Sequence, residues 1–220
     1  MSARTLRKLQ ADEAGTRERI LTAAAPLFAE NGFEATGVRA IAAAAEVNIA
    51  AVNYHFGSKD ALVAAVGERH VRSVNERRLD ALAIVMAAAP GGKPAVEDVI
   101  EAFVGTSVRF ISDCSSSNFI LMRLIHNRMK NDPENTGRVI REAMVPTLNK
   151  FVDALALALP GNTRTTLHQG LHLVVGSFMH SMTCSEMLEL VCPGVPCDPE
   201  ALIRRLVAFG SAGVKAITVR

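Results

Sequence analysis

The 220-residue chain contains no tryptophan, one tyrosine and nine phenylalanines, so aromatic residues make up only 5% of it. Alanine is abundant and runs of β-branched residues are short, a composition that favours helices over strands. Hydrophobic residues make up 49% and charged residues 21%, which excludes a disordered or collagen-like chain. The composition therefore predicts a compact helical protein with one large domain, or a small module joined to a larger one.

The chain also lacks an excess of charge of one sign, an apolar leader and paired cysteines. Its 24 Lys and Arg balance 22 Asp and Glu, so net charge alone does not indicate nucleic-acid binding. The four cysteines form no CxxC pair and the first residues lack the apolar core of a signal peptide, which predicts a cytoplasmic protein with reduced thiols. The uncharged stretch 165–185 contains three histidines and several hydroxyl side chains, so it predicts a buried helix and no membrane partner.

Motifs of catalysis are missing as well. The sequence has no GxSxG, HExxH or glycine-rich phosphate loop, and no cysteine–histidine pair with an orienting group. It therefore predicts neither an enzyme nor a cofactor.

What the sequence does contain is a series of helical patterns separated by turn-forming residues. No strand pattern survives, so we expect an all-α fold of about nine helices, with a small N-terminal helix-turn-helix module and a larger helical domain after it. The first helix ends near Gly32, and the expected later helices are 37–45, 49–56, 58–89, 95–113, 118–130, 137–159, 163–190 and 199–218.

The N-terminal module has helix-capping residues where a helix-turn-helix needs them. Gly32 suits the left-handed backbone that ends a helix, and Thr36, Asn48 and Ser58 are side chains that cap the helices after them. A short turn around Glu46 separates two of these helices, which is the plan of a helix-turn-helix.

Three runs in order, FEATGVRAIA (33–42), AEVN (45–48) and VNYHFGSKDAL (52–62), resemble the TetR family of transcriptional regulators, and the resemblance extends over about Thr16 to His70. It implies a DNA-binding domain (16–70) and a regulatory and dimerisation domain (71–220). Arg4, Arg7 and Lys8 precede the first acidic residue, so residues 1–15 are expected to form a flexible arm that reaches a DNA groove, with a disordered tail as the alternative.

The resemblance also implies which residues contact DNA. A slim helix over 49–56 fits the major groove, where Asn48 and Asn53 can hydrogen-bond base edges. Tyr54 and Lys59 match family positions that contact phosphates. A surface or capping role is the alternative for each position. The expected contact residues are Thr36, Arg39, Asn48, Ile49, Ala51, Asn53, Tyr54, His55 and Lys59.

Three residues depart from the family's usual pattern. Glu46 stands where the turn often has glycine, so the turn is either strained by about 1 kcal/mol or differently shaped. Gly37 replaces a frequent serine or threonine, which removes one phosphate contact. Asn53 replaces a common aromatic residue, which alters the expected base-reading geometry.

In the larger domain, the resemblance implies a homodimer formed by helices 163–190 and 199–218, with Gly170 and Gly176 allowing close approach, and a double-stranded DNA operator that is palindromic. It also implies a pocket for a small apolar ligand, with ordinary core packing as the alternative for every lining residue. The runs 47–59 and LMRL (121–124) are similar to a branch that responds to fatty acids or acyl-CoA. The expected lining is Phe103, Phe110, Phe119, Met122, Arg123, Phe151, Phe178 and Met179.

His168, His172, His180 and Cys184 form pairs four residues apart on one helix, a spacing that can bind a transition metal. No carboxylate or CxxC pair accompanies them as in a metal site, so no metal is expected. The predicted function is a homodimeric repressor, cytoplasmic and nucleoid-associated when bound to DNA, that a ligand releases from its operator. A transcriptional activator or a metal-responsive regulator of the same fold is the alternative. An architectural DNA binder and a helical enzyme are disfavoured by the neutral module and the missing catalytic motifs.

Overall fold

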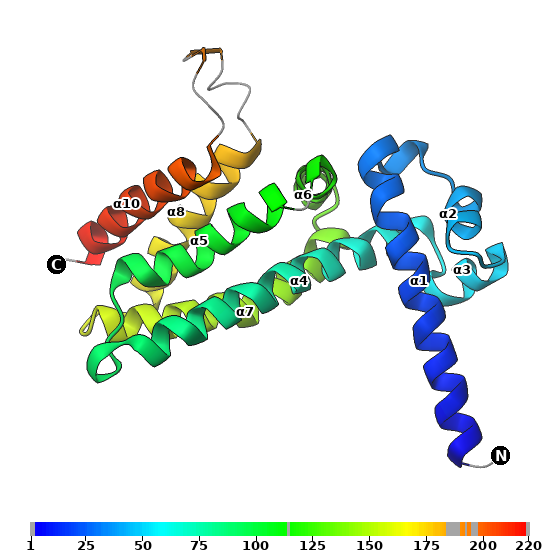
Figure 1. Cartoon of the computed structure of the whole chain (residues 1–220), viewed down its shortest axis with the longest axis horizontal. Coiled ribbons are helices and arrows are strands. Elements are labelled where there is room, and N and C mark those ends of the chain that lie inside the picture. Colours follow the sequence, from blue (N-terminus) through cyan, green and yellow to red (C-terminus); the bar gives the residue numbers. More distant parts are fainter. Residues whose placement is uncertain (1–2, 114, 184–189, 192, 195–197, 219–220) are drawn as a thin grey trace. The chain divides into compact units, whose positions relative to one another are not determined.

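The computed structural model describes residues 3–113, 115–183, 190–191, 193–194 and 198–218, and in this part of the chain it contains helices and turns but no strand. The all-α fold is confirmed. The four cysteines, and the end of the helix expected over 163–190, lie outside the described residues. The elements are α1 (Ala3–Ala35), α2 (Val38–Ala44), α3 (Ile49–Phe56), α4 (Lys59–Ala88), the 3-10 turn η1 (Pro90–Gly92), α5 (Val96–Asp113), α6 (Ser115–Asn131), α7 (Thr136–Ala158), α8 (Arg164–Thr183) and α10 (Pro199–Thr218) (Figure 1).

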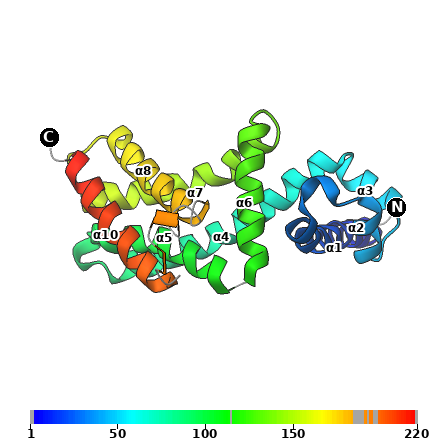
Figure 2. The same ribbon diagram turned by 90° about the horizontal axis from the view of Figure 1, so that it is seen from above.

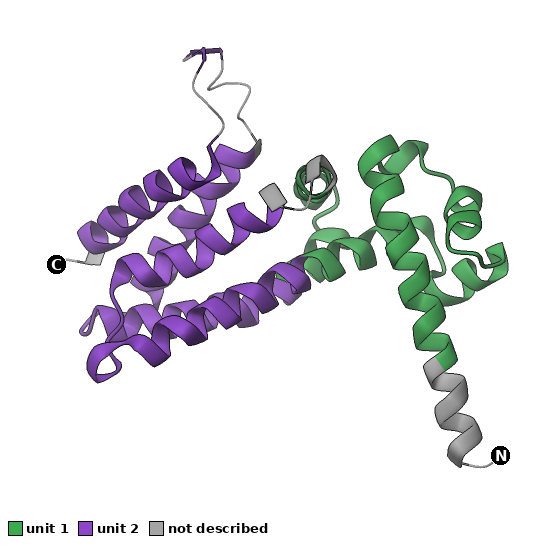
Figure 3. Cartoon of the chain, in the orientation of Figure 1, with its two compact units in different colours: residues 1–70, 117–141 green, residues 71–116, 142–220 purple. Residues whose placement is uncertain are grey.

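The chain divides into two compact units (Figure 3). The first comprises residues 1–70 and 117–141, and the second comprises 71–116 and 142–220. The division of the sequence into domains 16–70 and 71–220 stays a prediction. Segment 117–141, however, groups with the N-terminal module, although it is far from that module in the sequence.

Helix α1 begins at Ala3, so it includes residues that the sequence assigned to a flexible arm. The segment 3–14 is rich in Ala, Leu, Arg, Lys, Gln and Glu, which all have high helix propensity. At the other end, Gly32 has a φ of 78°, the left-handed conformation that was expected there, and a short helical stretch follows it as far as Ala35.

In the first unit, α2 and α3 pack against the second half of α1 (Figures 1 and 2). Phe28 and Ile41 are fully buried between these helices, and the rings of Phe28 and Phe33 meet edge to face at 5.1 Å. Arg69 of α4 fastens α4 to α1 by donating to Thr22 Oγ1 (2.9 Å) and to the Leu21 carbonyl oxygen (3.1 Å). The module's core thus packs α3 against α1 and α2, and Arg69 joins α4 to α1.

In the second unit, α10 lies along both α5 and α8 (Figures 1 and 2). Gly170 of α8 permits this close approach, because a Cβ atom there would lie 3.1 Å from Cδ1 of Ile217. The buried rings of Phe103 and Phe151 meet edge to face at 5.0 Å. At the surface, ion pairs join α5 to α10: Arg109 pairs with Glu200, and Lys215 pairs with Glu97.

Among the described residues, no helix has both the length and the apolar character that crossing a bilayer requires.

Candidate nucleic-acid interface

The turn between α2 and α3 has a strained backbone at Glu46, which is one of the two possibilities that the sequence left open. Glu46 has a φ of 54°, in the left-handed region that favours glycine. The Val47 amide donates to the Ala42 carbonyl oxygen at 3.0 Å, which closes the turn. A glutamate therefore holds the backbone conformation that fixes the direction of α3.

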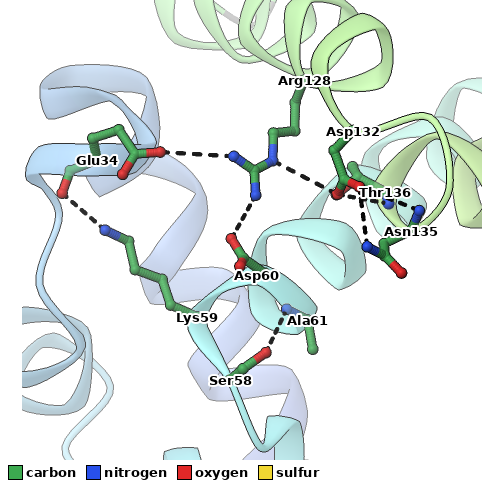
Figure 4. Close-up of polar contacts among 9 residues, drawn as sticks. All are labelled: Glu34, Ser58, Lys59, Asp60, Ala61, Arg128, Asp132, Asn135 and Thr136. Carbon is green, nitrogen blue, oxygen red and sulfur yellow. Dashed lines mark hydrogen bonds and ion pairs between the residues drawn. The ribbon is translucent and has the colours of Figure 1, made fainter.

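Side chains cap α3 and α4 as predicted. Asn48 Oδ1 accepts a hydrogen bond from the Ala51 amide at 2.7 Å, and Gly57 ends α3 with a φ of 72°. Ser58 Oγ accepts from the Ala61 amide at 3.1 Å (Figure 4). These caps fix both ends of α3, because they satisfy amides that a helix leaves unpaired.

The predicted cap of α2 is wrong. Gly37 is the N-cap residue, and no side chain caps this helix. Thr36 is only 3% exposed, and its hydroxyl donates back to the carbonyl oxygens of Gly32 (2.7 Å) and Leu27 (3.0 Å). Asn31 Nδ2 also donates to the Leu27 carbonyl oxygen, at 3.2 Å, just before the break in α1 at Gly32. Thr36 thus fastens the end of α1 instead of facing outward.

One face of α3 is open and carries mostly small or polar residues. Val52 is buried against the module, whereas Ala50 and Asn53 are exposed and Ile49 is 41% exposed. Tyr54 is 74% exposed, and its hydroxyl donates to Glu13 Oε1 of α1 at 3.2 Å. A helix with this shape and chemistry suits the major groove, which admits one helix and offers base edges for hydrogen bonding.

Of the remaining expected contacts, Ala51 and His55 are half-buried on α3, and Arg39 is exposed on α2. Lys59 lies at the start of α4, and its Nζ donates to the Glu34 carbonyl oxygen at 2.8 Å (Figure 4). All nine predicted residues lie in the first unit. Internal hydrogen bonds are made by four of them, Thr36, Asn48, Tyr54 and Lys59, whereas Arg39, Ile49 and Asn53 are exposed.

A polar cluster that the sequence did not indicate lies beside Lys59 (Figure 4). Arg128 of α6 pairs with Asp60 at the start of α4 (2.5 Å) and with Glu34 near the end of α1 (3.7 Å). Its Nε lies 3.9 Å from Asp132, and this buried nitrogen has no hydrogen-bond partner among the described residues. Sequence separation hides the cluster, because Arg128 and Asp60 are 68 residues apart.

Asp132 itself caps the start of α7. Its Oδ2 accepts from the Thr136 amide (3.1 Å) and hydroxyl (2.8 Å), and its Oδ1 accepts from the Asn135 amide (3.3 Å). Hydrogen bonds from Thr136, and then those from Asn135, hold the pKa of this carboxyl group below its usual range. The aspartate is therefore ionised and available to Arg128.

The predicted ligand-lining residues are divided between the units. Phe103, Phe110, Phe151 and Phe178 are buried in the second unit, which also contains Met179. Phe119, Met122 and Arg123 belong to the first unit. A groove of about 620 Å³ lies elsewhere in the second unit, on α7, α8 and α10, and none of the predicted residues lines it. Its lining is Leu148, Thr166, His168, Gln169, Leu171, His172, Leu173, Val175 and Ile217.

His168 and His172 line this groove, and His180 is exposed further along α8. Cys184, which the sequence grouped with them, lies outside the described residues. In the part of the chain that the structure describes, no three His, Cys, Asp or Glu side chains gather as a metal site would require.

Two short helices joined by a tight turn, with the second helix capped by Asn48 and open on one face, define a helix-turn-helix protein of the DNA-binding class. Residues 20–66 match the family model of bacterial regulatory proteins of the tetR family, and residues 101–213 match the tetracyclin repressor-like C-terminal domain. The chain belongs to the TetR family of transcriptional regulators.

Relatives with curated names match the helix-turn-helix region. The HTH-type transcriptional repressor Rv3405c of Mycobacterium tuberculosis is 57% identical over 47 residues, which are 21% of this chain and 25% of the relative. The HTH-type transcriptional regulator UidR of Escherichia coli is 38% identical over 58 residues, which are 26% of this chain and 30% of the relative. The matches thus span a third or less of these relatives, which are named as regulators and not as enzymes, as the sequence predicts.

Solved structures with low sequence identity share the fold over most of the chain. A TetR-family regulator from Mesorhizobium loti has a TM-score of 0.64 at 17% identity, covering 93% of this chain and 96% of its own. The transcriptional regulator FadR from Bacillus subtilis, in complex with stearoyl-CoA, has a TM-score of 0.70 at 15% identity, covering 89% of this chain and 98% of its own. At this identity the likeness establishes the fold alone.

Proposed function

We propose that this chain represses transcription by binding a palindromic DNA operator as a homodimer, with α3 in the major groove. The observation that carries the proposal is the open face of α3, where Ile49 and Asn53 are exposed and Tyr54 is 74% exposed. Asn53 can read base edges, Ile49 can contact a thymine methyl group, and Tyr54 and Lys59 can bind phosphates. The name of the Mycobacterium tuberculosis relative favours repression over activation.

A second copy of the chain is the proposed partner of an apolar face on α8 and α10. Leu173 of α8 is 60% exposed and Phe209 of α10 is 68% exposed. Gly176 and Gly213, on the same two helices, have no heavy atom within 4 Å of a Cβ placed there, so a partner helix can approach closely. Dimerisation doubles the DNA contacts and matches them to two half-sites about one helical turn apart.

The regulatory signal is proposed to be a small apolar ligand of the second unit, with a fatty acid or acyl-CoA as candidates. The buried phenylalanines of α5, α7 and α8 give this unit an apolar interior. Support for the acyl class comes from the fold shared with FadR, whose structure contains stearoyl-CoA. Such a ligand releases DNA only if it binds more tightly to a conformation that fits the operator poorly.

The experiment that tests DNA binding compares Tyr54→Ala and Lys59→Ala with the unaltered protein, by fluorescence anisotropy on a palindromic duplex selected with that protein. Each variant removes one phosphate contact, so we expect about tenfold weaker binding on all sequences. For Lys59→Ala, the dependence of log affinity on log salt concentration becomes shallower by about one.

Lys93→Ala is the matched control, because it removes the same charge from an exposed position of the second unit. It should bind the duplex as the unaltered protein does. Circular dichroism and sedimentation should show that all three variants keep their helices and their dimer. Normal affinity in both Tyr54→Ala and Lys59→Ala would contradict the proposed docking of α3.

A further inference from the structure

Arg78 of α4 is a buried arginine in the second unit. It is only 5% exposed, and its guanidinium group lies over the ring of Phe103, 4.0 Å from the ring centre. Nε donates to Ser107 Oγ and Nη1 donates to Asn75 Oδ1, both at 2.9 Å. The side chain is thus held between Asn75 of α4 and Phe103 and Ser107 of α5.

The positive charge of Arg78 has no counterion among the described side chains. Other arginines of the same unit do pair with carboxylates, as Arg109 does with Glu200 and Arg164 does with Asp153. Burial lowers the pKa of Arg78 to about 9, so the group remains protonated at neutral pH. A buried charge without a partner is costly, and a protein normally pairs it or exposes it.

The neighbours of Arg78 orient it but do not neutralise it. The Ser107 hydroxyl donates to the Phe103 carbonyl oxygen (2.7 Å), and Asn75 Nδ2 donates to the Ala143 carbonyl oxygen (3.1 Å). Both side chains are therefore fixed by the backbone and offer Arg78 only neutral acceptors. Nε and one N–H of Nη1 are used, and Nη2, which the protein does not fully enclose, makes no hydrogen bond within the described structure.

We infer that Arg78 anchors the carboxylate of an acidic, otherwise apolar ligand of the second unit. The free edge formed by Nη1 and Nη2 matches the two oxygens of a carboxylate, which such a fork binds by two parallel hydrogen bonds. The apolar body of the ligand packs against Phe103 and Phe151, which must move apart to admit it. The inference rests on the proposed ligand response, and it specifies the chemical class of that ligand.

The test is calorimetric titration of the full-length protein with two carboxylates and their neutral counterparts: decanoate with 1-decanol, and 2-naphthoate with 2-naphthol. At least one carboxylate should bind the unaltered protein about tenfold to a hundredfold more tightly than its counterpart, since charge-assisted hydrogen bonds are stronger than neutral ones. Arg78→Met should abolish this preference, and Arg78→Lys should retain part of it because the charge remains.

Arg77→Met is the matched control. Arg77 is the next residue on α4 and is exposed, with its guanidinium 4.9 Å from the ring centre of Phe110. This variant should keep the carboxylate preference. Thermal unfolding provides a second readout, because Arg78→Met removes an unpaired buried charge and should not lower the melting temperature.

A purely structural Arg78 gives a different result. Arg78→Met would then melt at a lower temperature and leave the preference between carboxylate and neutral probe unchanged. That result would overturn the inference. So would failure of both carboxylates to bind the unaltered protein, or tighter binding of decyl phosphate than of decanoate. Operator binding is measured separately without probes, so failure of the carboxylate site is distinguishable from failure of the proposed DNA-binding function.

Discussion

Glu46 combines an unfavourable backbone conformation with a position that directs α3. A left-handed backbone brings the Cβ of any L residue close to a carbonyl oxygen, and glycine avoids this contact. The φ of 54° therefore stores strain in the turn between α2 and α3. The turn persists because Asn48 and Gly57 cap α3, and because Ile41 of α2 and Val52 of α3 are buried in the module's core.

We predict that Glu46→Gly raises the free energy of unfolding by about 1 kcal/mol, because it relieves this strain. The measurement is chemical denaturation followed by circular dichroism. Glu46→Ala removes the same charge but keeps Cβ, so it should show no comparable gain. A Glu46→Gly protein no more stable than Glu46→Ala would mean that the turn is not strained.

Asp132 makes the stability of the first unit depend on pH. Hydrogen bonds from Thr136 and Asn135 lower its pKa, so they stabilise the folded state while the carboxyl group is ionised. This contribution is present at neutral pH and is lost as the pH falls through the lowered pKa. Asp132→Ala should therefore melt below the unaltered protein at neutral pH, with a gap that narrows in acid.

Thermal unfolding at several pH values measures this gap. Asp80→Ala, at an exposed position of α4, is the control and should show little difference at any pH. A gap for Asp132→Ala that stays constant into strong acid would show that the ionised carboxylate is not what stabilises the start of α7.

At the residue scale, sequence reasoning succeeded where the contact is local. Asn48 and Ser58 bond to amides three residues ahead, and residue type and position suffice to predict such caps. The cap predicted for Thr36 was wrong, because its hydroxyl bonds to carbonyl oxygens of α1 that become its neighbours only after folding. The hydrogen bond from Lys59 to the Glu34 carbonyl oxygen was not predicted, for the same reason. The sequence also did not indicate that Arg78 is buried without a carboxylate partner, because this depends on how the helices pack.

At the scale of elements, Arg128 joins three helices of the first unit. It lies in the last turn of α6 and pairs with Asp60 at the start of α4 and with Glu34 near the end of α1 (Figure 4). Arg128 also lies near Asp132, so its positive charge reduces the repulsion between Asp132 and these two carboxylates. The cluster thus ties α6 to the helices that frame the DNA-binding module.

Arg128→Met should lower the free energy of unfolding by about 1 to 2 kcal/mol, because the carboxylates lose their charged hydrogen-bond partner. Lys130→Met is the control, since it removes a charge from an exposed position in the same turn of α6. Denaturation curves of the two variants measure the difference. Equal stability of Arg128→Met and Lys130→Met would show that the cluster does not hold α6 in place.

Helical periodicity predicted the elements well because it is local. The ranges 49–56 and 199–218 agree with α3 and α10, and most other described helix ends differ by a few residues, whereas α1 begins within the segment expected to be a flexible arm. Periodicity does not report which helices pack together. The grouping of 117–141 with the first unit depends on contacts such as Arg128 with Asp60, and no pattern along the chain indicates them.

At the scale of the whole molecule, function is proposed to require two copies of the chain. Phe209→Glu puts a charge into the proposed interface and should convert the dimer to a monomer that keeps its helices, because Phe209 is exposed and contributes little to its own core. Operator affinity should fall by about a hundredfold or more, since each half-site is then bound alone.

Sedimentation and circular dichroism check the monomer and its helices. Ile84→Glu is the matched control, because Ile84 is equally exposed but lies on α4, outside α8 and α10. It should remain a dimer with normal operator affinity. A dimeric Phe209→Glu protein with normal affinity would place the interface elsewhere.

The central claim is that two α3 helices read a palindrome. Selection of binding sites from a random double-stranded DNA library with the full-length protein tests it most directly. The account predicts an enriched inverted repeat whose half-sites are about one helical turn apart, centre to centre. Enrichment of no motif, with an affinity set only by salt concentration, would contradict it and indicate binding to the DNA backbone alone.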